Sequence, residues 1–111
     1  MTILDIQQAV AMRFRLRVAD LRGTRRPPSI SGPRAIGMYL ARVLLGMSFP
    51  QIGMRFGGKD HSTVIHACKR VRAADLPDHQ LRELHGLHAA LTAGLTVRPA
   101  GPTVWKADRR A

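Results

Sequence analysis

The apolar residues of this chain recur at helical spacing from its first turns onward. Asp5 precedes Gln8 by three residues, an arrangement that resembles a capping box at the start of a helix. The apolar residues that follow fall on one helical face: Ile6, Ala9, Val10 and Phe14. We predict a helix from about residue 5 to 15, a short helical turn at 18–21 and an extended basic loop at 23–28, where prolines disfavour helix in the residues before them.

A longer apolar stripe predicts the central helix. Pro33 suits a first helical position, where a missing N–H costs nothing. The apolar residues after it keep helical spacing: Ile36, Tyr39, Leu40, Val43, Leu44 and Met47. We therefore expect a buried helix that begins at Pro33.

Residues 48–72 follow the order short helix, glycine turn, helix. Ser48 suits an N-cap and Gln51 the third helical position, with a proline in the first turn between them. The glycine pair at 57–58 ends this helix, because glycine accepts the left-handed conformation, and the next helix begins near Asp60. Its inward stripe is Val64, Ala67, Cys68 and Val71. This order of elements is typical of a helix-turn-helix.

A last helix is expected to open at Pro77 and to pack on the core through its leucines: Leu81, Leu84, Leu87, Leu91 and Leu95. Beyond it, prolines and glycine interrupt the chain, and no further element is expected. The sequence thus predicts an all-α bundle of about six helices in a DNA-binding domain at 1–95, followed by a flexible tail at 96–111.

Charge gives the first indication of a partner. The 111-residue chain has room for one domain, and it carries 18 Lys and Arg against 7 Asp and Glu, a net charge of +11. From Arg13 to Arg72, 13 basic residues face only Asp20 and Asp60, so the excess lies in the folded part. A polyanion is the natural partner. The alternative, an arginine-rich surface that is merely solvated, remains open at this stage.

Other classes of function find little support in the sequence. Cys68 is the single cysteine, which excludes an internal disulfide and leaves no zinc-module spacing. Residues 58–63 lack the glycine spacing of a phosphate loop, and His85 and His88 have no evident third ligand. No leader or membrane span is apparent. We expect a cytoplasmic, nucleoid-associated protein without catalysis, metal or cofactor.

The residues that open the second helix of the helix-turn-helix offer groove chemistry. Asp60 can accept from the cytosine amino group, and Thr63 carries a methyl group suited to thymine. We predict that four residues here contact bases: Asp60, His61, Ser62 and Thr63. Alternatively, Asp60 and Ser62 only cap the helix and His61 is a solvated imidazole.

The basic loop and the helix starts offer contacts of a second kind. Arg25 and Arg26 precede two prolines, where a guanidinium can enter a narrow A·T-rich minor groove, or simply be solvated. Arg34, at the predicted start of the central helix, suits a phosphate, and Arg42 and Arg55 are further candidates.

One segment resembles a known family. Residues 56–67, FGGKDHSTVIHA, closely resemble the signature of the C-terminal DNA-binding domain of DnaA, the bacterial chromosomal replication initiator. Shorter segments support this: 18–21, 25–26, 33–34 and 48–53. The resemblance covers roughly residues 3 to 95.

The resemblance implies a six-helix domain that binds the DnaA box, a short asymmetric A·T-rich element of double-stranded DNA. It implies base contacts from Arg26, Asp60, His61, Ser62 and Thr63. Backbone contacts would come from Arg25, Arg34, Arg42, Phe49, Pro50 and Lys59. The chain departs from the family pattern at five positions: Pro27, Pro28, Gly32, Ala35 and Lys59, the last of which is usually arginine. A weaker phosphate grip or a shifted target preference would follow.

The ATPase domain, the helicase-recruiting domain and the linker of the full initiator have no counterpart in these residues. We therefore expect a stand-alone, monomeric DNA reader that competes with the initiator or regulates transcription, of chromosomal, phage or plasmid origin. The alternative is an adaptor that binds DNA nonspecifically and a protein through its last helix and the Trp105 tail.

Overall fold

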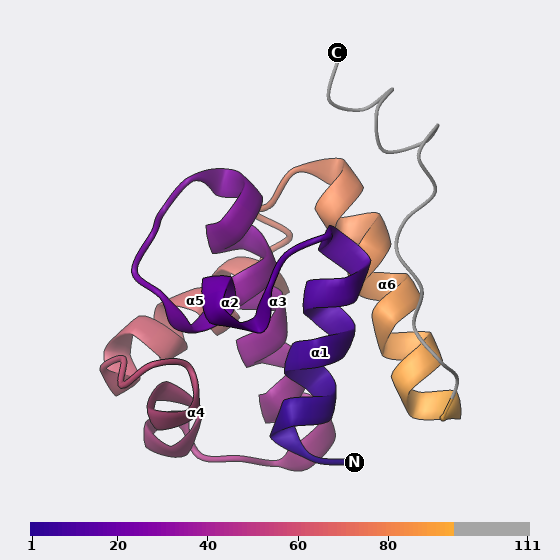
Figure 1. The fold of residues 1–111 in the computed structure, drawn as a ribbon. Coiled ribbons are helices and arrows are strands. Elements are labelled where there is room, and N and C mark those ends of the chain that lie inside the picture. The colour runs from indigo at the N-terminus through magenta and orange to yellow at the C-terminus, as the bar shows by residue number, and fades with distance from the viewer. Residues whose placement is uncertain (95–111) are drawn as a thin grey trace.

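The computed structural model describes residues 1–94, which form six α-helices and, within that range, no strand (Figure 1). In chain order these are α1 (Ile3–Phe14), α2 (Val18–Arg22), α3 (Pro28–Leu45), α4 (Phe49–Arg55), α5 (His61–Arg72) and α6 (Asp78–Ala93). The predicted all-α fold of about six helices is confirmed. The expectations for Leu95, for the tail at 96–111 and for Trp105 fall outside the described residues.

The central helix α3 contacts all five other helices. Figure 1 shows α6 lying along α1 on one side of the domain, with α4 and α5 on the other. The largest fully buried apolar side chains come from every helix: Ile6, Leu21, Ile36, Met38, Leu40, Ile52, Phe56, Val64 and Leu87. Burying side chains of this size stabilises the fold by roughly 1.5–3 kcal/mol each. The prediction that the leucines of α6 pack on the core is confirmed, because Leu84, Leu87 and Leu91 are buried.

The start of α3 differs from the prediction. The helix begins at Pro28, and Pro33 lies inside it, so the expectation that Pro33 opens the helix was wrong. A proline within a helix lacks one N–H, and its ring crowds the residue before it. That residue is Gly32, whose missing Cβ relieves the crowding. A Cβ on Gly32 would also collide with the side chain of Gln80. The basic segment is therefore shorter than predicted at its C-terminal end.

The start of α1 also lies earlier than predicted, at Ile3 and not near residue 5. Thr2 is the N-cap: its hydroxyl accepts from the Asp5 N–H at 3.2 Å, and the Asp5 carboxylate accepts from the Thr2 N–H at 2.8 Å. The capping box therefore pairs Thr2 with Asp5, and the predicted pairing of Asp5 with Gln8 was wrong. The backbone hydrogen bond from Thr2 is the main reason why the pKa of Asp5 lies below its usual value.

The helix-turn-helix follows its local sequence signals. Ser48 and Gln51 form a capping box at the start of α4, as predicted. Gly57 and Gly58 take positive φ angles of 91° and 76°, which L side chains rarely adopt, and this turns the chain into α5. Asp60 is the N-cap of α5. Among the described residues, no helix has the length and apolar character needed to cross a bilayer.

Candidate nucleic-acid interface

The polar side chains in the first turn of α5 are exposed to solvent. Val64, Cys68 and Val71 are buried against the core, which turns the opposite face of the helix outward. The four residues predicted to contact bases, Asp60, His61, Ser62 and Thr63, are all exposed. The helix-turn-helix therefore presents the groove chemistry that the sequence suggested on one accessible turn.

Asp60 both caps α5 and remains accessible. Its Oδ2 atom accepts from the Ser62 N–H at 3.0 Å and from the Ser62 hydroxyl. These hydrogen bonds, the side-chain one first, lower the pKa of Asp60, with a smaller contribution from the His61 charge. The side chains of Asp60 and His61 keep relative exposures of 64% and 60%, and His61 Nδ1 lies 3.6 Å from Asp60 Oδ1. Capping occupies the hydroxyl of Ser62 and leaves Asp60 Oδ1 for other partners.

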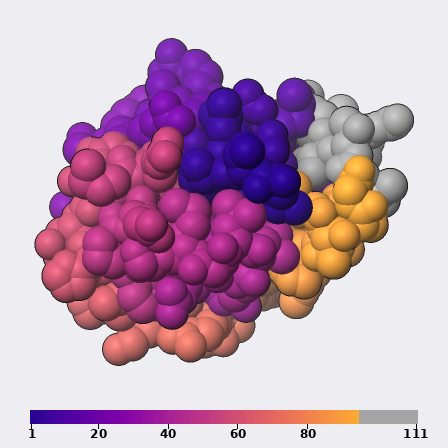
Figure 2. All heavy atoms as spheres, turned by 90° about the horizontal axis from the view of Figure 1, so that it is seen from below, coloured from indigo at the N-terminus to yellow at the C-terminus, as the bar shows by residue number. Residues whose placement is uncertain are grey.

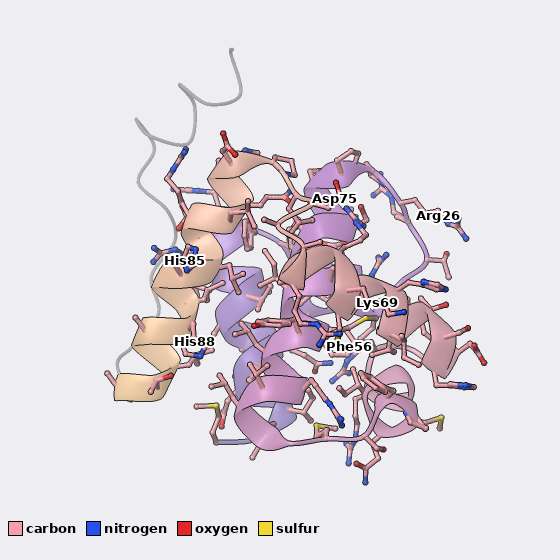
Figure 3. All side chains as sticks on the ribbon, turned by 180° about the vertical axis from the view of Figure 1, so that it is seen from behind. Arg26, Phe56, Lys69, Asp75, His85 and His88 are labelled. Atoms are coloured by element: carbon pink, nitrogen blue, oxygen red, sulfur yellow. The ribbon has the colours of Figure 1, made fainter. Side chains whose placement is uncertain are left out.

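The basic loop lies beside this turn. Arg25 and Arg26 are exposed between α2 and α3, and Figure 3 shows Arg26 projecting from the body of the domain on the side opposite His85 and His88 of α6. A groove of about 560 Å³ runs between the loop, α3 and α5. Its polar lining is Thr24, Arg26, Ser31, Arg34, Lys59, Asp60, Thr63, His66 and Arg70. The predicted minor-groove and major-groove elements thus border one basic groove.

Two residues of this groove escaped the sequence reading. His66 and Arg70 follow Thr63 at positions i+3 and i+7 of α5, so all three share one helical face. The signal that could have identified them was helical periodicity, extended from the polar first turn along the same face. They lengthen the polar surface by about two turns of helix.

Arg34 does not occupy the helix start that was predicted for it. It lies in the interior of α3 and is 7% exposed. Its Nε donates to the carbonyl of Leu21 at 3.0 Å and its Nη2 to the carbonyl of Asp20 at 2.8 Å. Burial, and then repulsion from the Arg26 charge, lower its pKa from the usual value. The predicted position of Arg34 at the helix start was therefore wrong, and its guanidinium keeps both N–H groups of Nη1 and one of Nη2 for other partners.

Lys59 is also directed inward. Its ammonium donates to the carbonyls of Gly23 and Phe56, both at 2.6 Å, and to that of Arg22 at 3.2 Å. An ammonium has three N–H groups, so these contacts use all of them. Burial, followed by the Arg34 charge, lowers the pKa of Lys59. The geometry conflicts with the phosphate contact expected for this residue.

Three other predicted phosphate contacts gather where α3 meets α4. The Arg42 guanidinium lies over the Phe49 ring, 4.4 Å from its centroid, and Nη1 donates to the Met47 carbonyl at 2.9 Å. Pro50 is exposed in the first turn of α4. In Figure 2, which shows the molecule from below, the α3–α4 region lies in the middle of the view and α6 (orange) at the right edge. This cluster is separate from the groove that Arg26 lines.

A buried polar residue supports the helix-turn-helix from behind. Gln7 of α1 is fully buried, and its Nε2 donates to the carbonyl of Arg55, the last residue of α4, at 2.8 Å. Its Oε1 accepts from Arg22 Nη2 at 2.9 Å. Sequence reasoning missed this role, although a glutamine beside Ile6 on the inward face of α1 was a signal. Within residues 1–94, no group of three or more His, Cys, Asp or Glu could hold a metal ion.

Known proteins are similar to this chain in sequence. Residues 3–71 match the family described as bacterial dnaA protein helix-turn-helix. The chain is 44% identical over 88 residues to the chromosomal replication initiator protein DnaA of Aromatoleum aromaticum, covering 79% of this chain and 18% of that protein. It is 48% identical over 80 residues to the same protein of Sphingopyxis alaskensis (72% and 18%) and 47% over 79 residues to that of Microcystis aeruginosa (71% and 18%).

The chain spans less than a fifth of the length of the relatives it matches. The match to the helix-turn-helix family covers residues 3–71, and a helix-turn-helix is a DNA-binding element. The chain therefore belongs to the bacterial DnaA helix-turn-helix family.

Proposed function

We propose that this domain binds DnaA-box-like elements of duplex DNA in a sequence-specific manner and acts without ATP hydrolysis. The observation that carries the proposal is the groove between the basic loop, α3 and α5. There, Arg26 and the first turn of α5 are exposed beside each other. A duplex recognised this way meets a guanidinium in one groove and short polar side chains in the next.

Base readout is assigned to the exposed turn and the loop. Asp60 Oδ1, His61 and the Thr63 methyl face the major groove, where each good contact discriminates by roughly 1–3 kcal/mol. Ser62 contributes through its contact with Asp60, and Arg26 enters the minor groove. His66 and Arg70 extend this surface along α5.

Phosphate binding is assigned to cations that flank this surface. Arg25 lies in the loop. Arg42 lies in the last turn of α3 and stacks on Phe49, which opens α4 beside Pro50. Such contacts fix register without reading sequence. Buried Arg34 has three N–H groups left for this purpose, two on Nη1 and one on Nη2.

The names of the relatives support a regulatory role. They are named chromosomal replication initiators, and this chain matches less than a fifth of their length. We infer that the protein occupies the same class of DNA element, either in competition with an initiator or as a regulator of transcription. Both roles require specific binding and no catalysis.

The test is binding to a DnaA box and to a scrambled duplex of equal composition, at two salt concentrations. We expect a preference for the box of roughly 10³-fold or more. Thr63→Ala is expected to lose roughly 1–3 kcal/mol on the box and little on the scrambled duplex. Equal, steeply salt-dependent binding to both duplexes would refute specific recognition and favour the nonspecific adaptor.

A matched pair of arginine variants separates phosphate contacts from general charge. Arg25→Ala is expected to weaken binding to both duplexes and to lower the salt slope by about one. Arg82→Ala removes an exposed arginine from α6, on the other side of the domain, and should leave the slope unchanged. A similar change in salt slope for both variants would show that DNA does not prefer the side of the basic loop over the side of α6.

A further inference from the structure

The C-terminal end of α2 is capped by two cations from distant parts of the chain. The last carbonyls of a helix have no partner within the helix. Here Arg34 donates to the carbonyls of Asp20 and Leu21, and Lys59 donates to those of Arg22 and Gly23. Every carbonyl from Asp20 to Gly23 therefore accepts from a cationic side chain.

Lys59 has a further partner at the end of a second helix. Its ammonium also donates to the carbonyl of Phe56, the C-cap of α4. The ends of α2 and α4 both carry partial negative charge, so a cation between them is favourable. Beside it, Gly57 packs so tightly that a Cβ would collide with the Arg22 carbonyl. The helix-turn-helix is thus joined to the end of α2 by backbone contact and by one ammonium.

Lys59 connects the two segments proposed to face DNA, which are the first turn of α5 and the loop that carries Arg26. It immediately precedes Asp60, the N-cap of the recognition helix α5. Its acceptor Gly23 lies two residues before Arg25, in the loop that carries Arg26. That loop is held at its other end by α3, which starts at Pro28. Lys59 therefore fixes the near end of the loop to the start of α5.

We propose that Lys59 is a positioning residue that sets the spacing between Arg26 and the first turn of α5, rather than a phosphate ligand. This inference rests on the proposed function, because it concerns how two reading elements are held for one duplex. All three N–H groups of its ammonium are used internally, so a phosphate would have to displace backbone carbonyls. A preorganised loop binds more tightly because its ordering cost is met before DNA arrives.

The test compares Lys59→Met with Arg26→Ala and with the double variant. Methionine keeps much of the apolar stem and removes the three donors. We expect Lys59→Met to weaken box binding by about tenfold. The salt slope should stay unchanged, and the effect should nearly vanish in the Arg26→Ala background. A phosphate ligand would instead lower the slope by about one and act additively with Arg26→Ala, which would overturn the proposal.

Two further measurements keep the outcome decisive. Circular dichroism shows whether Lys59→Met folds. If it does not, the salt dependence is measured on Lys59→Gln, which keeps two N–H donors but has no charge. An unchanged salt slope in Lys59→Gln supports positioning, and a drop of about one overturns it. Lys59→Arg, which restores donors, is expected to recover box preference lost in Lys59→Met.

The free protein tests the tether without DNA. Backbone ¹⁵N relaxation should show Arg25 and Arg26 becoming more mobile in Lys59→Met, and unchanged mobility would overturn the proposal. Failure of the proposed function gives a different result: wild-type protein would bind box and scrambled duplex equally, whatever the loop does.

Discussion

The two sides of the domain hold their positive charges in different ways. On the side where α1 meets α6, Arg13 pairs with the Glu83 carboxylate, and the charges cancel. On the side of the loop and α5, Arg34 and Lys59 donate to neutral backbone carbonyls. Carbonyls satisfy the N–H groups of a cation but leave its net charge in place.

This difference shows how a small domain can be ordered and still strongly basic on one side. Hydrogen bonding to backbone orders the cations beside the groove without adding carboxylates that would repel a polyanion. Arg26 and Arg70 add exposed charge to the same groove. The summed field attracts DNA and speeds association.

The largest loss of stability is expected from disrupting the close contact between Gly57 and the Arg22 carbonyl. Gly57→Ala forces a Cβ against the Arg22 carbonyl at a φ of 91°, so we expect it to lower the free energy of unfolding by roughly 3 kcal/mol. Urea denaturation measures this. Gly58→Ala is the matched control: its φ of 76° is also positive, but its Cβ meets open space, so a loss of roughly 1 kcal/mol is expected. Equal losses would show that the contact with α2 contributes nothing.

A smaller loss of stability is expected when a cation bound to carbonyls or one bound to a carboxylate is removed, and only the first loss should also weaken DNA binding. Arg34→Met removes the cationic donor from the carbonyls of Asp20 and Leu21 and should cost about 2 kcal/mol of stability. It should also weaken DNA binding, because the loop follows directly from α2. Arg13→Met is the matched variant on the other side, expected to cost about 1 kcal/mol and to leave box affinity unchanged. A comparable loss of affinity in Arg13→Met would break the comparison between the two sides.

The helix-turn-helix was predictable because its signals are local. The capping box of Ser48 and Gln51, the turn at Gly57 and Gly58, and the cap at Asp60 each act within a few residues. Their backbone conformations are dictated by side-chain chemistry that can be read directly from the sequence. The exposed first turn of the recognition helix follows from the same signals and from the apolar stripe behind it.

The cation contacts were not predictable because their partners are backbone atoms far along the chain. Lys59 reaches carbonyls 36 and 37 residues away, and Gln7 reaches one 48 residues away. A carbonyl has no sequence signature, so nothing marks it as an acceptor. The predictions therefore gave Arg34 and Lys59 phosphate contacts and did not foresee that both cations donate to backbone carbonyls. The interior position of Pro33 was also missed. The space that requires glycine at position 32, before this proline, is limited by Gln80, a residue distant in the sequence.

The smallest effect concerns acid. The pKa of Asp5 is lowered chiefly by the backbone hydrogen bond from Thr2, and that of Asp60 chiefly by the side-chain hydrogen bond from Ser62. A carboxylate with a lowered pKa binds its proton more readily in the unfolded chain, so its contribution to stability is present above the usual 3.8 and is lost as the pH falls below it. We expect the melting temperature to be steady near neutral pH and to fall when the pH drops below 3.8.

Asp5→Asn and Asp60→Asn compare this effect on the two sides of the domain. Asparagine keeps an oxygen that can accept from the Thr2 N–H at position 5 or cap α5 at position 60, and it does not titrate. Each variant should therefore reduce the acid sensitivity of the melting temperature. At neutral pH their effects on DNA should differ. Asp5 lies at the start of α1, away from the groove, and its variant should bind the box normally. Asp60→Asn removes an acceptor that lines the groove and should change base preference. Unchanged preference would assign Asp60 to capping alone and leave readout to His61, Thr63 and the loop.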